Sequence, residues 1–471
     1  MPHPVPLFPR GFVFSTSPVV APTEYVQGPL LENFYVHPWT SVEAAGDRDL
    51  FVIIIGLCVT TDPAEIEPPA STLLKALQAD EAAFLNALGR YSGRYAIIFG
   101  SAEAPKVVND ATAMRSVFYS DDFTIIGSHA PIVQRAVTGS ARRDRMPFQY
   151  GYPGNRTPFD RTRLLTPNTY LDVAEARVRR FWPIVAPPAR EVDDVAAETL
   201  LAATVALRNV SAGRKVKMAL TAGLDSRVIL GVTLNARLPV EAYTYGTESN
   251  TETDRLFAAD LAAQFGIPHT TVKRPELSKE LGASLGAANY SAHHKMVVPG
   301  LIEWFNDHTA VALSGNLLEI GRDFFGPMRT QGVPEPVSPE TMTNLHYRRT
   351  GLPTRERIAE YGGDRWKGES EEAFGAYIAD TDYASTLGLI DPFDLFYWEH
   401  RMTAWHGTLL LERDFYGEAF IPFNSRNIFS AMLGIGREDR SNAAVFYRML
   451  NLVDPSLLDL PVNPRSWPIR P

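Results

Sequence analysis

Asp225 and Ser226 form a pair of side chains suited to phosphate and metal chemistry, and they stand in a turn of small residues. The turn follows the alternating apolar stretch 216–220, which predicts a strand, and we expect a helix to resume at Ser226. Small residues let backbone N–H groups approach an anion closely, and the free amides of a helix N-terminus add a favourable dipole. A carboxylate at this place can hold Mg²⁺ against a phosphate. An ordinary strand-to-helix turn has the same pattern, so the surrounding sequence must decide between the two.

Composition and charge narrow the classes of protein. The chain has 471 residues, of which 45% are hydrophobic and 21% charged, as in a soluble protein of two or three domains. Its net charge of −9 argues against a nucleic-acid partner, which needs clustered Lys and Arg. Cys58 is the single cysteine, so neither a disulfide framework nor a cysteine-based zinc site is expected.

The sequence favours a cytoplasmic protein without a membrane partner. The proline-rich start of the chain lacks the charged-then-apolar order of a signal peptide. The most apolar stretch, 51–59, is too short to span a bilayer and predicts a buried strand. The lone cysteine also fits a reducing compartment.

Two domains are expected, joined near the prolines at 183–188. Residues 1–185 have short strand signals at 51–56, 94–100 and 123–127, interrupted by a helix at about 71–88, which indicates an α+β domain. In residues 186–471 strands alternate with helices, which predicts an α/β domain with a doubly wound parallel sheet. From about residue 353 the chain reads as mainly helical. The carboxyl ends of parallel strands, where ligands bind in such folds, would carry the Asp225 turn.

The turn resembles the pyrophosphate loop of the N-type ATP pyrophosphatases, Ser-Gly-Gly-x-Asp-Ser, with Thr and Ala in place of its Ser and first Gly. A second stretch, 314–322, follows the apolar strand 310–313 and resembles the loop Ser-Gly-x-Gly-x-Asp-Glu of the asparagine synthetase family. In that family the Asp residues of the two loops share Mg²⁺. The resemblance thus implies that Asp225 and Glu319 bind the metal, although they lie far apart in the sequence.

The resemblance also implies an ATP site. Its residues would come from the first loop, from the end of the strand at 241–246, which would border the adenine, and from the second loop. They are Leu220, Thr221, Ala222, Gly223, Leu224, Asp225, Ser226, Tyr245, Gly246 and Gly315.

Further resemblances extend over most of the chain, from about residue 93 to 426. The stretch 420–426 is similar to the family's Arg-x-Pro-Phe-Leu-Asp, which follows a long helix, expected here at 397–411. The stretches 93–98, 108–110 and 115–119 resemble the core of the family's Ntn-type glutaminase domain. That domain uses an N-terminal cysteine as its nucleophile, whereas position 2 is Pro2 and Cys58 lies in an apolar strand. We therefore expect a glutaminase-like domain without glutaminase activity.

Without a glutaminase, the nitrogen must come from elsewhere, either as free ammonia or, as the favoured alternative, as an amine on the substrate. That arrangement resembles β-lactam synthetases and lasso-peptide cyclases, which adenylate a carboxylate and close an intramolecular amide. In the second loop, β-lactam synthetases have Tyr where this chain has Asn316, which cannot act as a general base. The family's C-terminal Lys has no clear match, and Arg465 is the candidate substitute. Asn316 and Arg465 are thus the predicted catalytic residues.

The sequence as a whole predicts an ATP- and Mg²⁺-dependent ligase that couples a carboxylate to an amine and releases AMP. Its partner would be a small molecule or a peptide that carries both groups, and the oligomeric state is left open. A catalytically degenerate relative acting as a binding or scaffold protein is the alternative. A tRNA-modifying enzyme built on the same loop is disfavoured by the acidic charge and by the missing cysteines.

Overall fold

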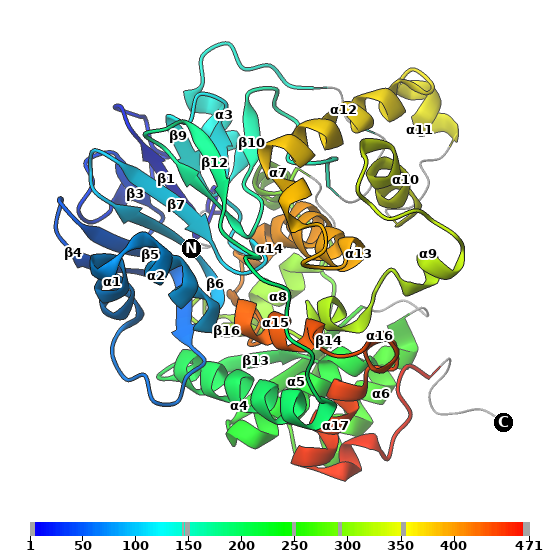
Figure 1. The fold of residues 1–471 in the computed structure, drawn as a ribbon. Coiled ribbons are helices and arrows are strands. Elements are labelled where there is room, and N and C mark those ends of the chain that lie inside the picture. Colours follow the sequence, from blue (N-terminus) through cyan, green and yellow to red (C-terminus); the bar gives the residue numbers. More distant parts are fainter. Residues whose placement is uncertain are drawn as a thin grey trace.

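A computed structural model describes residues 5–143, 146, 151–246, 251–290, 294–349 and 355–464 of the chain. It places three sheets in two groups: two antiparallel sheets from the first part of the chain, and one parallel sheet from the second (Figure 1). In this view the helices drawn in yellow and orange lie above the parallel sheet, beside the two antiparallel sheets.

The two antiparallel sheets pack face to face. The first has the order β10-β8-β9-β1-β3-β2 and the second the order β12-β11-β7-β6-β5-β4. Apolar side chains that alternate along the strands fill the space between them, among them Phe12, Phe34, Ile53 and Ile98. The strands are β1 (Phe12–Ser15), β2 (Val26–Gln27), β3 (Phe34–Val36), β4 (Val42–Gly46), β5 (Phe51–Thr60), β6 (Tyr91–Gly100), β7 (Pro105–Asn109), β8 (Phe118–Ser120), β9 (Ile125–Gly127), β10 (Thr162–Leu164), β11 (Thr169–Asp172) and β12 (Arg177–Arg180).

Helices cover the outer faces of this sandwich. α1 (Pro69–Ala79) and α2 (Glu81–Ala87) pack on the second sheet, and α3 (Ala130–Ala136) packs on the first. The single helix expected at about 71–88 is therefore two helices. The break comes at Asp80, whose extended backbone ends α1 and whose carboxylate accepts a hydrogen bond from Ala83 N at the start of α2.

The second part of the chain forms the predicted parallel, doubly wound sheet. Its order is β15-β14-β13-β16-β17, and all neighbouring strands run parallel. The strands are β13 (Val216–Ala219), β14 (Val240–Tyr245), β15 (His269–Val272), β16 (Val311–Leu313) and β17 (Glu418–Phe420). The chain winds outward from β13 to β15 and then returns to the other side of β13 with β16, so the strand order reverses between β13 and β16.

Helices cover both faces of the parallel sheet. One face carries α4 (Val192–Ser211), α5 (Leu224–Ala236), α6 (Glu252–Gln264) and α17 (Ala444–Val453). The other carries α7 (Lys279–Ala288), α8 (Val298–Phe305) and α14 (Thr408–Arg413). Buried side chains of these three helices form one hydrophobic cluster with side chains of α3 and of the first antiparallel sheet. The two parts of the chain therefore share one hydrophobic cluster.

The third part is helical, as the sequence predicts. It includes η3 (Leu318–Arg322), α9 (Gly326–Thr330), α10 (Pro339–Arg349), α11 (Arg355–Glu360), α12 (Arg365–Asp380), η4 (Tyr383–Thr386), α13 (Pro392–Leu395), the π-helix η5 (Phe396–Gly407), α15 (Arg426–Leu433), α16 (Arg437–Ser441) and η6 (Pro455–Leu458). Within the described ranges, no helix combines the length and apolar character that crossing a membrane requires.

Candidate functional site

The two loops with predicted chemistry meet at the carboxyl edge of the parallel sheet. The first follows β13 and the second follows β16, the neighbouring strand at which the order reverses. In open α/β sheets this switch point is where ligands bind. Gly315 allows the loops to approach closely, since a Cβ at this position would lie 2.4 Å from the carbonyl oxygen of Asp225. The sheet topology thus confirms that the loops are brought together.

Ser226 organises the first loop from inside. Its hydroxyl accepts a hydrogen bond from Thr221 N at 3.1 Å and lies within donating distance of the carbonyl oxygens of Thr221 and Gly223. Helix α5 begins at Leu224, two residues earlier than expected, with Gly223 as its N-cap. The side chains of Leu220 and Ala222 are buried in the sheet core, so these two residues offer only backbone groups to a ligand.

The amides of the turn are not as open as the sequence suggests. Ala222 N donates to the carboxylate of Asp254, in the first turn of α6, at 2.9 Å. Gly223 N donates to the Thr221 hydroxyl at 3.2 Å. An anion bound to these two amides would have to replace both hydrogen bonds. Sequence reasoning missed Asp254 because it lies one strand away from the turn that it closes.

Asp225 and Glu319 lie together, as the resemblance implies. Arg322 joins them: its Nη2 is 2.8 Å from Asp225 Oδ1 and 3.6 Å from Glu319 Oε1. Burial and the neighbouring Glu319 carboxylate raise the pKa of Asp225 to about 8, and Arg322 only partly offsets this rise. Two carboxylates that repel each other in a partly buried site favour a cation between them.

The donor set fits Mg²⁺ delivered with a nucleotide. Within the described part of the chain, no three His, Cys, Asp or Glu side chains are grouped to hold a metal ion by themselves. Mg²⁺ is usually held by one or two carboxylates together with phosphate oxygens and water. Asp225 and Glu319 supply such a pair, and the guanidinium of Arg322 supplies a positive charge next to both carboxylates.

The second loop keeps a glycine-like backbone at a leucine. Leu317 stands where the family's loop has its second Gly, and it adopts φ = 77° and ψ = −10°. This left-handed conformation is unfavourable for a branched side chain and costs of order 1–3 kcal/mol. Leu317 is fully buried in the cluster with Phe325 and Phe396, and this burial offsets the cost. Leu317 therefore holds a backbone conformation that usually favours glycine.

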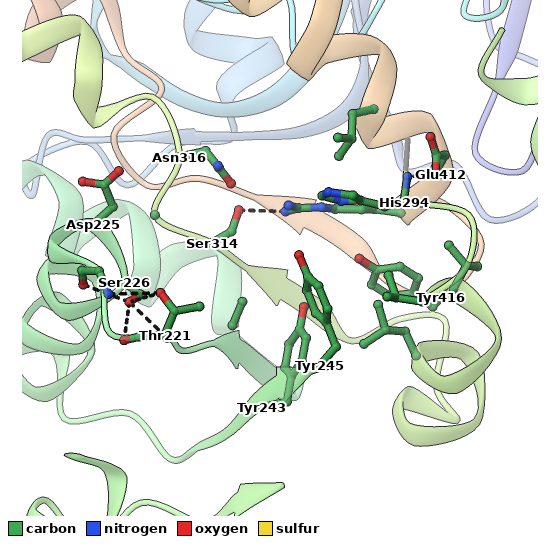
Figure 2. A pocket seen from close by; sticks show the side chains of 18 of the residues that line it. Thr221, Asp225, Ser226, Tyr243, Tyr245, His294, Ser314, Asn316, Glu412 and Tyr416 are labelled. Carbon is green, nitrogen blue, oxygen red and sulfur yellow. Dashed lines mark hydrogen bonds between the residues drawn. The ribbon is translucent and has the colours of Figure 1, made fainter. Parts of the chain in front are cut away.

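A cavity of about 380 Å³ opens beside both loops. Thr221, Asp225, Ser226, Gly315 and Asn316 line one side of it. Figure 2 shows Asp225 and Asn316 on that side, Tyr243 and Tyr245 in the middle, and His294, Glu412 and Tyr416 on the far side. The cavity is thus long enough to bring the two loops and a second group of side chains to one ligand.

Tyr245 lines the cavity, as predicted for a residue near the adenine, and so does Tyr243. Gly246 does not contribute to the lining; its carbonyl oxygen accepts a hydrogen bond from Arg255, and its φ of 107° suits glycine. Arg465 falls outside the described residues. Asn463, two positions earlier, lines the cavity, and its N–H donates to the Ala222 carbonyl at 3.0 Å, so the chain passes the first loop just before Arg465.

Sequence reasoning missed the far side of the cavity. Leu409, Glu412, Arg413 and Tyr416 lie on α14 and the turn after it. Their spacing of three and four residues is that of one helix face, a signal visible in the sequence but indistinguishable there from a packing face. Glu412 is buried, and its carboxylate accepts from Asn289 Nδ2 at 2.6 Å and from His294 N at 2.9 Å.

Buried ion pairs connect α14 to the antiparallel sheets. Asp414, directly after α14, forms a bidentate pair with Arg94 on β6 and lies 3.9 Å from Arg115. Arg10 and Arg115 also contact Glu418, at 3.3 and 3.8 Å. We call these five residues the buried ion cluster. It fixes the segment that carries Arg413 against the two antiparallel sheets.

The third family-like stretch lies at this same junction and not in the cavity. Asn424 donates to the carbonyl oxygen of Gly93 and to Asp110, and Arg426 donates to Asn168. Cys58 is buried in β5, and burial raises the pKa of its thiol well above the usual value. The expectation that Cys58 is a core residue is therefore confirmed.

Comparison with known protein families finds a match for the segment that contains the first loop. Residues 196–285, from α4 to α7, match the family model described as asparagine synthase. This segment is therefore similar to the asparagine synthase family. No curated protein sequence matches the chain.

Two solved structures show weak likeness. A glutamine phosphoribosylpyrophosphate amidotransferase from B. subtilis, complexed with ADP and GMP, is 12% identical with a TM-score of 0.21, over 59% of this chain and 58% of that one. A glutamine-dependent NAD⁺ synthetase from Acinetobacter baumannii, complexed with ADP, is 12% identical with a TM-score of 0.20, over 52% and 57%. The chain thus spans less than two thirds of either protein, and likeness at this level carries no argument about the site.

Proposed function

We propose that this protein is an ATP-dependent ligase that activates a substrate carboxylate as an acyl-adenylate and couples it to an amine. The observation that carries the proposal is that Asp225 and Glu319 meet on Arg322 at the switch point, beside a cavity that Asp225 lines and that reaches both loops. The asparagine synthase match over residues 196–285 supports it independently.

Each part of the site has a role in this reaction. The first loop and Gly315 would hold the phosphates of ATP, and Asp225 and Glu319 would hold Mg²⁺, which neutralises charge on the leaving pyrophosphate. A carboxylate oxygen of the substrate forms a bond to the α-phosphorus, and pyrophosphate leaves. The amine nitrogen then forms a bond to the acyl carbon, AMP leaves and the amine loses one proton. Asn316 orients one of the reactants by hydrogen bonding but cannot accept that proton.

The amine is proposed to come from the substrate. Cys58 is the single cysteine of the sequence, and its thiol is buried and protonated, so it does not supply the nucleophile of a glutaminase. A small molecule or peptide with both a carboxylate and an amine would then be closed intramolecularly, as in β-lactam synthetases or lasso-peptide cyclases. In this proposal the antiparallel sheets act as a structural support for α14.

One observation favours the second candidate, a degenerate relative that binds without catalysis. The Ala222 amide is closed by Asp254, and Arg322 is paired with Asp225, so two groups needed for ATP·Mg²⁺ already have partners. If these contacts persist in the presence of nucleotide, no adenylation can occur.

Carboxylate-dependent ATP–pyrophosphate exchange separates the two functions. We expect the wild-type protein to incorporate labelled pyrophosphate into ATP when a panel of amino acids, N-acylated amino acids and aliphatic and aromatic acids is supplied with Mg²⁺. Asp225→Asn and Glu319→Gln should each abolish exchange. Glu175→Gln, an exposed carboxylate distant in sequence from both loops, is the matched control and should retain it. Absence of exchange with every acid, in a protein that binds ATP, would favour the degenerate relative.

A further inference from the structure

The half of the cavity formed by α8 and α14 has a chemistry different from the loop half. Much of its wall is apolar and includes Val297, Val298 and Leu301 at the start of α8, and Leu409 on α14. The aromatic rings of Tyr243 and Tyr416 continue this wall, and the polar side chains of His294 and Glu412 also line this half of the cavity. Burial raises the pKa of Tyr243 to about 12, so its hydroxyl is neutral and the wall carries no negative charge from this residue.

Arg413 is the positive charge at the boundary between the two halves. One of its guanidinium nitrogens donates to the Ser314 hydroxyl at 2.9 Å, directly after β16. Among the described residues, no carboxylate lies within ion-pair distance of Arg413, in contrast to Arg94, Arg180, Arg322 and Arg440, which all pair with Asp or Glu. A guanidinium has five N–H donors in a planar arrangement that matches a carboxylate. An arginine that lines a cavity without a protein anion is suited to an anionic ligand group.

Glu412, the residue before Arg413, is held by other partners. Its carboxylate accepts hydrogen bonds from Asn289 and from the backbone N–H of His294. Arg413 also acts on Tyr243 and Tyr245, where its charge opposes the rise in pKa that burial causes. Arg413 therefore lies where the apolar wall, the tyrosines and the second loop converge.

We propose that the α8–α14 half of the cavity binds the substrate acid, with Arg413 pairing with the carboxylate to be activated and the apolar wall holding an aromatic or branched aliphatic group. This inference rests on the proposed function and names its substrate class: an apolar carboxylic acid, not a small dicarboxylate. The carboxylate held by Arg413 would lie next to the second loop, towards the phosphate side of the site.

Exchange with two acids of similar length tests the apolar wall. Phenylpropanoate should support ATP–pyrophosphate exchange at least about tenfold better than succinate. The phenyl ring of phenylpropanoate would be buried against the apolar wall, whereas the second carboxylate of succinate would find no partner there. Val297→Thr keeps the shape of the wall and adds a hydroxyl, and it should reduce this preference. Preference for succinate, with robust exchange, would overturn the inference while leaving the proposed ligase intact. Exchange with neither acid nor any other would refute the ligase itself.

Variants of Arg413 test the carboxylate contact. Arg413→Gln should raise the KM for phenylpropanoate about 10- to 100-fold, the loss expected for one charge-assisted pair, with a smaller change in kcat. Arg413→Lys should recover part of the affinity, since it restores the charge without the planar fork. Calorimetric binding of α,β-methylene-ATP should remain unchanged in Arg413→Gln, as in the surface control Arg48→Gln. Weaker nucleotide binding with an unchanged KM for the acid would show that Arg413 holds phosphate, and would overturn the assignment.

Discussion

The buried ion cluster provides the most quantitative prediction, the effect of Asp414→Asn on stability. Asp414 is fully buried, and its carboxylate pairs with Arg94 through both oxygens. Burial alone would raise the pKa of Asp414, but Arg94 and Arg115 outweigh that effect and hold the pKa below its usual value. The side chain is therefore ionised in the folded protein, and the cluster contains three arginines and two carboxylates.

The expected loss follows from the charge balance. Asp414→Asn keeps the shape of the side chain but leaves the three buried arginines with Glu418 alone, a carboxylate that the more exposed Arg214 also contacts at 3.4 Å. Removing one partner of a buried pair costs about 3–5 kcal/mol, because the remaining charge is uncompensated. Arg94→Met in addition leaves two arginines and one carboxylate, which restores the original excess of one positive charge. The double variant should therefore lose clearly less free energy of unfolding than the sum of the two single variants.

Urea unfolding followed by tryptophan fluorescence measures these differences. A double-mutant cycle of wild type, both single variants and the double variant gives the coupling free energy, which we expect to exceed about 1.5 kcal/mol. A loss below about 1 kcal/mol for Asp414→Asn, or strict additivity across the cycle, would refute the reasoning that these charges depend on one another.

Three further predictions concern other parts of the molecule. Incubation with glutamine, with or without ATP, should release no glutamate above background, because the thiol of Cys58, the single cysteine, is buried. Release that Cys58→Ala abolishes would contradict this. Asn316→Ala should weaken turnover by the roughly 1–3 kcal/mol of one buried hydrogen bond and leave the shape of the pH profile unchanged; complete loss of amide formation with intact adenylation would show a larger role. His400→Phe should make stability less sensitive to acid. Burial lowers the pKa of His400 to about 3. Between its usual pKa and that value, the unfolded chain therefore binds a proton that the folded protein does not. From pH 7 to pH 5 the free energy of unfolding of the wild type, measured by urea unfolding at both pH values, should fall by about 2 kcal/mol more than that of the variant.

The parallel sheet and its two loops are the features that sequence patterns predict best. An alternating strand followed by a small-residue turn is a local signal, and the rule that parallel strands end at one edge brings Asp225 and Glu319 together without further information. The substitution of Leu317 for glycine looks disruptive in the sequence. The structure shows that burial of the side chain offsets the unfavourable φ, a compensation that depends on distant residues.

The far side of the cavity could not be predicted, and neither could the closure of the first loop. Glu412, Arg413 and Tyr416 follow a helical spacing that also describes core packing, and only the tertiary fold shows which face meets a cavity. Likewise, Asp254, on the helix after the neighbouring strand β14, contacts Ala222, and no local pattern encodes that contact. The division at residue 185 and the roles of Asn316 and Arg465 stay predictions.

Transfer of an isotope from substrate to nucleotide tests the central claim most directly. A carboxylic acid that supports pyrophosphate exchange is labelled with ¹⁸O in its carboxylate and incubated with ATP, Mg²⁺, the protein and hydroxylamine as the amine that releases AMP. The nucleotide products are examined by mass spectrometry. Attack of the carboxylate on the α-phosphate predicts AMP that carries one ¹⁸O atom, together with unlabelled pyrophosphate. Label in inorganic phosphate, with ADP as the nucleotide product, would contradict the account, because the carboxylate would then have attacked the γ-phosphate.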